Sequence, residues 1–144
     1  MQSYSFIYNR VYFYSKEKRR YRRVPLNYNV EYPLINFKPI RDLIVNGKYL
    51  QVIDISEGGM GIKSNLLLKE NDFISFQLRL PNADYSFECI ACIRNCRYED
   101  DCSIYGVEFV KLDLRYMKLI REYVDETYCE LIKKYGESVF SQKA

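Results

Sequence analysis

The chain has 144 residues, of which 48% are hydrophobic and 28% are charged, and its formal net charge is +3. These values predict one domain with a real core, and they exclude a bulk field strong enough to capture DNA. Histidine is absent, so the commonest general base and the commonest metal ligand are missing. No apolar run reaches the roughly 18–20 residues of a membrane span, and residues 1–6 lack the features of a secretory signal. We therefore expect a cytoplasmic protein without a cofactor.

The first part of the chain divides into an aromatic segment and a basic one. Residues 1–15 are rich in Tyr and Phe, and they predict either a terminal strand or an arm that folds over another surface. Six of the eight residues from 16 to 23 are Lys or Arg. The positive charge of the chain is therefore concentrated just before its first strand-like run.

From residue 24 onward, short apolar or alternating runs are separated by turn residues such as Asn46-Gly47 and Gly58-Gly59. These runs predict six strands, over residues 26–37, 49–55, 60–64, 72–80, 85–97 and 103–110. Many strands joined by short turns are typical of a closed or nearly closed antiparallel barrel. The predicted fold class is mainly β: a six-stranded antiparallel β-barrel over residues 25–111, followed by a C-terminal α-helix.

The last part of the chain changes to a helical period. Apolar residues recur at helical spacing over 114–135, with Asp113 suited to the N-cap and Gly136 to the stop. A helix with an apolar stripe must cover a surface, and we expect the end of the barrel, with a partner's helix as the alternative. Residues 137–144 then form a tail.

The five cysteines have an irregular spacing, at positions 89, 92, 96, 102 and 129. The Cys89-x-x-Cys92 pair invites a zinc site. In a strand, however, residues three apart point to opposite faces, which is poor geometry for chelating one ion. We expect reduced, buried structural thiols instead.

The basic segment contains Arg19 and Arg23, which are four residues apart and so face the same side in either a helix or a strand. Arginine forks can bind guanine O6 and N7, clamp a phosphate or stack on a purine. Lys18 and Arg22 offer the same spacing one residue earlier, and Arg20 lies within both pairs. The alternative interpretation is a solvated basic run that loosely attracts nucleic acid or acidic lipid.

A second motif, Asp-x-Ser-x-x-Gly, closes an apolar run at residues 54–59. Asp54 can accept hydrogen bonds from the N–H groups of guanine, and Ser56 can add a hydroxyl contact. Gly59 allows the backbone to approach a ligand closely, and Gly58 is a further candidate. The alternative interpretation is a structural turn, because these residue types are common in turns.

Together the two motifs resemble the PilZ domain, a bacterial receptor module for cyclic di-GMP. The Arg-x-x-x-Arg motif leads directly into Val24-Pro25-Leu26, and the Asp-x-Ser-x-x-Gly motif continues into Gly61-Ile62. Leu80-Pro81 and residues 105–109 (Tyr-Gly-Val-Glu-Phe) resemble the later strands of that family. The resemblance covers roughly residues 17–135.

The resemblance implies a domain over residues 16–136, divided into a mobile Arg-x-x-x-Arg loop at 16–24, the barrel at 25–111 and the helix at 113–136. It implies a binding site in which two arginines grip guanine edges and phosphate and the second motif lines the opposite wall: Arg19, Arg23, Asp54, Ser56 and Gly59, with Lys18, Arg20, Arg22 and Gly58 as additional candidates. It also implies that ligand binding orders the loop and that a protein partner reads the new surface. That partner would belong to flagellar, pilus or synthase machinery that controls motility, surface attachment or exopolysaccharide.

Two other functions stay open at this point. The chain could be a PilZ-like adaptor that docks to its partner without a ligand, or a small basic β-barrel that binds single-stranded nucleic acid. An enzyme is disfavoured because no pair of nucleophile and base can be identified in the sequence. Whether the protein is a monomer or a dimer is left open by the sequence.

Overall fold

The computed structural model describes residues 22–40, 43 and 46–136. The predictions for residues 1–15 and for the tail at 137–144 lie outside the described residues, and so do those for Lys18, Arg19 and Arg20.

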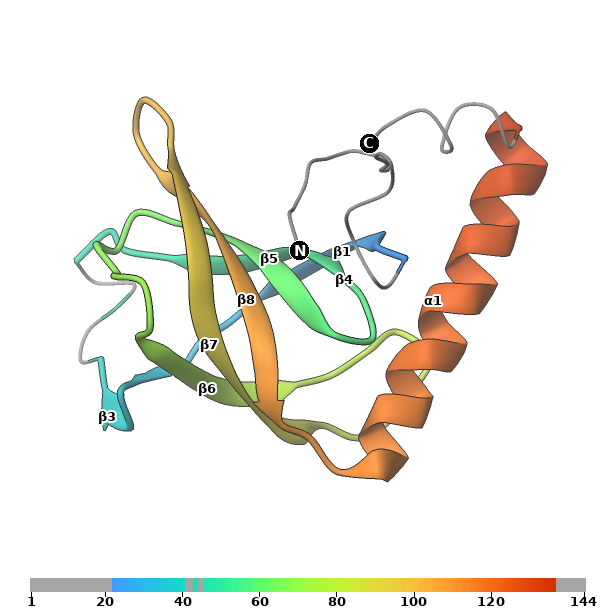
Figure 1. Cartoon of the computed structure of the whole chain (residues 1–144), viewed down its shortest axis with the longest axis horizontal. Coiled ribbons are helices and arrows are strands. Elements are labelled where there is room, and N and C mark those ends of the chain that lie inside the picture. The colour runs from blue at the N-terminus through green and yellow to red at the C-terminus, as the bar shows by residue number, and fades with distance from the viewer. Residues whose placement is uncertain (1–21, 41–42, 44–45, 137–144) are drawn as a thin grey trace.

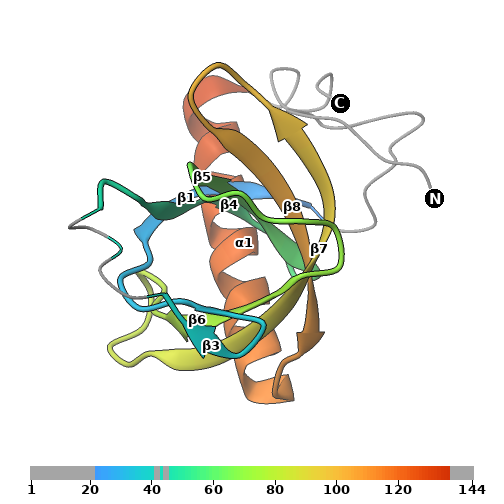
Figure 2. The same cartoon turned by 90° about the vertical axis from the view of Figure 1, so that its left-hand side faces the viewer.

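Eight antiparallel strands form one sheet in the order β1-β4-β5-β8-β7-β6-β2-β3. Their bounds are Val24–Asn29 (β1), Leu34–Ile35 (β2), Lys38–Pro39 (β3), Leu50–Ile55 (β4), Gly59–Ser64 (β5), Phe73–Leu78 (β6), Phe87–Tyr98 (β7) and Ser103–Lys111 (β8). Figures 1 and 2 show how this sheet curls into a half-barrel. The mainly β class with one C-terminal helix is confirmed, although the strands number eight within the described ranges instead of six.

The two additional strands are β2, which belongs to the run at residues 26–37 that was predicted to be a single strand, and β3, which follows directly after that run. β1 ends at Asn29, and the run resumes only at β2. Asn36 and Phe37 then take positive φ angles of 51° and 67°, which make the tight turn between β2 and β3. Two successive positive φ angles match the twist of a two-residue hairpin, and Asn tolerates this conformation better than most residues.

The curl of the sheet brings β1 close to β6, although four other strands, β4, β5, β8 and β7, lie between them in the sheet order. The Tyr28 hydroxyl on β1 donates to the carbonyl oxygen of Gln77 on β6 over 2.7 Å, and the Tyr28 ring stacks on Phe76 with 6.5 Å between centroids. Side-chain contacts thus draw the two elements together and enclose the core.

The core consists of inward side chains from all six long strands and two helix residues. Alternate positions of each strand supply them, as in Met60 and Ile62 of β5 or Tyr105 and Val107 of β8. The opposite face of the same strands carries polar residues and glycines together with a few apolar ones, and the candidate site lies on that face.

Helix α1 spans Leu114–Tyr135 and lies across one end of the half-barrel (Figures 1 and 2). Asp113 caps its first turn by accepting from the backbone N–H of Arg115, and Gly136 ends it with a φ of 90°. Ile120 and Val124 are buried in the barrel core. The predicted helix bounds, both caps and the barrel end as packing surface are confirmed.

The cysteines divide between core and surface. Cys89 lies in the core cluster, and burial raises the pKa of its thiol to about 12. Cys92 is also buried, while Cys129 on α1 is exposed. Within the described ranges, no three Cys, Asp or Glu side chains gather in a way that could hold a metal ion. None of the helices in this part of the chain has the length and apolar composition that crossing a bilayer requires.

Candidate functional site

The two sequence motifs meet through one ion pair. Arg23 Nη1 donates to Asp54 Oδ1 over 3.1 Å, although 31 residues separate them in the chain. The two side chains are 25% and 31% exposed, so the pair lies at the surface with both groups still open to a ligand. The backbone explains the contact: Pro25 on β1 is paired with Asp54 on β4, and Arg23 directly precedes β1.

The neighbouring Arg22 points to helix α1 instead. Its guanidinium carbon lies 3.7 Å from the ring centroid of Tyr128, and its Nη1 lies 4.0 Å from Asp125 Oδ1. Successive residues of an extended chain face opposite sides, so Arg22 and Arg23 cannot both reach Asp54. Of these two arginines, it is therefore Arg23 that faces the second motif.

A β-bulge determines the direction of Asp54. Val52 pairs with Ile62 and Asp54 pairs with Gly61, which leaves Ile53 as an extra residue on β4. Val52 and Ile55 both face the core, so strict alternation from Val52 would turn Asp54 inward. The extra residue places the carboxylate on the outer face, as bulges beside functional sites often do.

Ser56 builds the turn between β4 and β5. It is only 3% exposed, and its Oγ accepts from the backbone N–H groups of Gly58 and Gly59, each over 3.2 Å. Its own N–H donates to the Gly59 carbonyl oxygen over 2.8 Å. The hydroxyl thus holds the shape of the turn, and its predicted contact with a ligand stays a prediction.

Gly59 is required by strand packing. A Cβ atom at this position would lie 2.0 Å from the carbonyl oxygen of Val107 on the adjacent β8. No side chain fits against a backbone oxygen at that distance, because neither strand can move without breaking the ladder. The neighbouring Gly58 carbonyl oxygen accepts from the Phe109 N–H over 2.9 Å, which ties the turn to the same strand.

Helix α1 braces both halves of the site. Arg121 Nη2 donates to Glu57 Oε2 over 2.7 Å, which fixes the turn of the second motif. The Tyr123 hydroxyl donates to the Pro25 carbonyl oxygen over 3.2 Å, which fixes the start of β1. The sequence analysis did not identify Arg121 and Tyr123 as residues of the site. In the sequence they look like ordinary residues of an amphipathic helix, one on its polar face and one at the edge of its apolar stripe.

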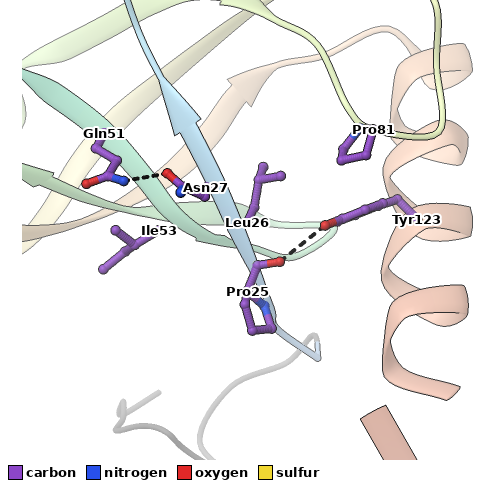
Figure 3. A pocket seen from close by; sticks show the side chains of 7 residues that line it. All are labelled: Pro25, Leu26, Asn27, Gln51, Ile53, Pro81 and Tyr123. Carbon is purple, nitrogen blue, oxygen red and sulfur yellow. Dashed lines mark hydrogen bonds between the residues drawn. The ribbon is translucent and has the colours of Figure 1, made fainter. Parts of the chain in front are cut away.

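A pocket of about 470 Å³ lies along β1 and β4 (Figure 3). Its wall is mostly apolar and comes from β1, β4, the turn after β6 and helix α1: Pro25, Leu26, Asn27, Gln51, Ile53, Pro81 and Tyr123. Asn27 and Gln51 are joined by a side-chain hydrogen bond. The bulge residue Ile53 lines this pocket, and so does Pro25, which is paired with Asp54, so the pocket lies close to the backbone of the second motif. Its size and apolar lining suit part of a small organic ligand.

The structure therefore brings Arg23, Asp54, Ser56 and Gly59 to one end of the β4–β5 hairpin and turns Arg22 away from them. A guanidinium and a carboxylate in contact, with a mostly apolar pocket on the same two strands, can hold a planar polar molecule that also carries negative charge.

Comparisons with known proteins agree with this architecture. The family model described as PilZ domain matches residues 17–126, about three quarters of the chain. None of the curated proteins matches. Among solved structures, the Bacillus subtilis inhibitor of motility, MotI/DgrA, is similar with a TM-score of 0.61 and 14% sequence identity. The alignment covers 78% of this chain and 52% of that one, so this chain spans about half the length of that protein. At this identity the likeness concerns the fold.

Proposed function

The chain belongs to the PilZ domain family, and from this premise we propose that it is a receptor for cyclic di-GMP that relays the bound state to a protein partner. The observation that carries the proposal is the contact between Arg23 and Asp54. It joins the two motifs by which the sequence resembles the family, and Pro25 and Ile53, which adjoin these motifs in the chain, line a mostly apolar pocket.

Each side chain has a chemical role in this proposal. Arg23 donates to a phosphate or a guanine acceptor, and Asp54 accepts from guanine N–H groups. Arg19 would add a second guanidinium from the basic segment. Ser56 and Gly59 hold the turn on which Asp54 stands. The ligand itself undergoes no chemistry.

The bracing contacts of α1 support a relay from this site. A ligand that draws Arg23 away from Asp54 would act on the start of β1, where Tyr123 contacts Pro25. Arg22, which directly precedes Arg23, contacts Tyr128 farther along α1. A change at the basic segment can therefore alter the surface of α1 that a partner reads. Because the structurally similar MotI/DgrA is an inhibitor of motility, motility is the process that we propose first.

Isothermal titration calorimetry with cyclic di-GMP tests the proposal. We expect saturable binding by the unaltered chain, with Arg23→Ala and Asp54→Ala each weakening it by tenfold or more, since a charge-assisted hydrogen bond contributes about 1.5–3 kcal/mol. Arg79→Ala serves as the matched control, because Arg79 is an exposed arginine whose side chain only reaches the Ala83 carbonyl over 3.4 Å.

The titration also separates the alternative functions. A PilZ-like adaptor would give no heat with cyclic di-GMP. A single-strand nucleic-acid binder would bind an oligonucleotide without preference for guanine and would lose affinity steeply with salt. Either result would overturn the proposal.

A further inference from the structure

The basic segment and the second half of helix α1 carry opposite charges. Six of the eight residues from 16 to 23 are Lys or Arg. The stretch of α1 from residue 122 to residue 130 contains four carboxylates and neither Lys nor Arg: Glu122, Asp125, Glu126 and Glu130. Exposed opposite charges attract each other over a distance of about 10 Å at ordinary salt. The sequence alone, however, does not bring the two segments together.

In the structure, Arg22 makes the contact between them. Its guanidinium carbon lies 3.7 Å from the centroid of the Tyr128 ring, and its Nη1 lies 4.0 Å from Asp125 Oδ1. Asp125 and Tyr128 are three residues apart on α1, so they are neighbours on one side of the helix. We call these three residues the arginine clasp.

The arginine clasp lies away from the turn of the second motif. Arg121 contacts this turn through Glu57, and Tyr128 follows Arg121 by seven residues, which is about 10 Å along a helix. Within the described ranges, Tyr128 is also the last residue of α1 that packs against the core cluster. The chain that precedes Arg22 therefore starts beside the second half of α1, about two turns beyond the contact with Glu57.

Arg22 and Arg23 tie the same stretch of chain to two different surfaces. Arg23 contacts Asp54 on the sheet, whereas Arg22 contacts α1. In an extended segment, Arg19 would face the same side as Arg23 but stand about 13 Å from it. The segment must therefore turn back toward Asp54 before both arginines can grip one ligand. A segment that Arg22 holds on α1 resists this turn, so the clasp opposes ligand binding.

The contacts of the clasp are of a strength that a ligand can overcome. The side chains of Arg22 and Asp125 are 50% and 62% exposed, so water weakens their ion pair. The stacking of an exposed guanidinium on the Tyr128 ring adds a contribution of similar size. Together the two contacts favour the closed clasp by about three- to fivefold over the open one.

We propose that the arginine clasp is an autoinhibitory contact, which holds the basic segment on α1 until cyclic di-GMP draws this segment to the site at Asp54. Opening the clasp removes a guanidinium from Asp125 and from the Tyr128 ring, and this makes the charge of the second half of α1 more negative. A protein partner that reads α1 then meets a different surface in the bound state. This inference rests on the proposed function, because it takes cyclic di-GMP as the ligand.

Calorimetric titration of purified variants with cyclic di-GMP tests the inference. Arg22→Ala should tighten binding by about threefold, because a larger fraction of the chains is then ready to bind. Asp125→Lys should tighten it at least as much, since a lysine at this position repels Arg22. Glu126→Lys is the matched control: Glu126 is an exposed carboxylate on the same helix turn but outside the clasp, and its reversal changes the net charge by the same amount.

Two further measurements separate the clasp from a general effect of charge. In the Arg22→Ala background, Asp125→Lys should tighten binding no more than Glu126→Lys does, because the contact is already lost. In NMR spectra of the unaltered chain, cyclic di-GMP should move the Tyr128 amide signal toward its position in Arg22→Ala. If the unaltered chain binds no cyclic di-GMP, the proposed function and this inference fall together. If it binds, this inference alone is overturned when Arg22→Ala binds no more tightly, or when Glu126→Lys tightens binding as much as Asp125→Lys.

Discussion

Tyr105 ties the loop between β5 and β6 to the core, and removing its hydroxyl should destabilise the whole domain. Its side chain is fully buried, and the hydroxyl makes two hydrogen bonds. It donates to the Leu66 carbonyl oxygen over 2.8 Å and accepts from the Leu68 N–H over 3.0 Å. Tyr105→Phe keeps the ring in place and removes only these two bonds.

The loss can be estimated group by group. A buried polar group left without its partner costs about 1–3 kcal/mol. The Leu68 N–H is buried and should cost the middle of that range, whereas Leu66 is only partly buried, so its carbonyl can recover water and should cost less. Together we expect about 2–4 kcal/mol of lost unfolding free energy, which for a domain of this size lowers the melting temperature by roughly 10 °C.

Urea denaturation followed by circular dichroism measures this difference. Tyr32→Phe is the control, because Tyr32 is 85% exposed and its hydroxyl faces water. The control should stay within about 0.5 kcal/mol of the unaltered chain. A loss below that same limit for Tyr105→Phe would refute the reasoning, since the two bonds would then contribute nothing that water cannot replace.

Three further outcomes follow from the geometry. Gly59→Ala should prevent folding or cost several kcal/mol in a thermal melt, because its Cβ would collide with the Val107 carbonyl oxygen; a stable, soluble variant would contradict this. Burial raises the pKa of the Cys89 thiol from 9.0 to about 12, so the folded state holds a proton that the unfolded chain releases, and stability should fall between those pH values. Cys89→Ala should show a shallower fall in urea titrations across that window, and an identical slope would contradict the assignment. Arg22→Ala should lower stability by less than about 1 kcal/mol through loss of the Tyr128 contact, and should change cyclic di-GMP affinity far less than Arg23→Ala does; equal losses in calorimetry would show that both registers grip the ligand.

Local patterns were sufficient for much of this protein. Periodicity was sufficient to predict the helix at 114–135 and five of the six long strands, because a helix and a half-buried strand each place apolar residues at a characteristic spacing in the sequence. The caps of the helix followed from the residue types at its two ends. The run at 26–37 was the exception. It breaks over residues 30–33, and after β2 it turns back into β3 through a positive φ at Phe37, a conformation that local strand propensity does not predict for an aromatic residue.

The sequence by itself determined the family, the order of the elements and the two motifs that carry Arg23 and Asp54, because these depend on residue type and spacing alone. Tertiary structure decided which way the polar side chains face. The bulges at Ile53 and Arg94 reverse the alternation of β4 and β7, and an extra residue in a ladder is defined only by the partner strand. For that reason the outward direction of the Asp54 and Asn95 side chains became visible only once the strands were laid side by side.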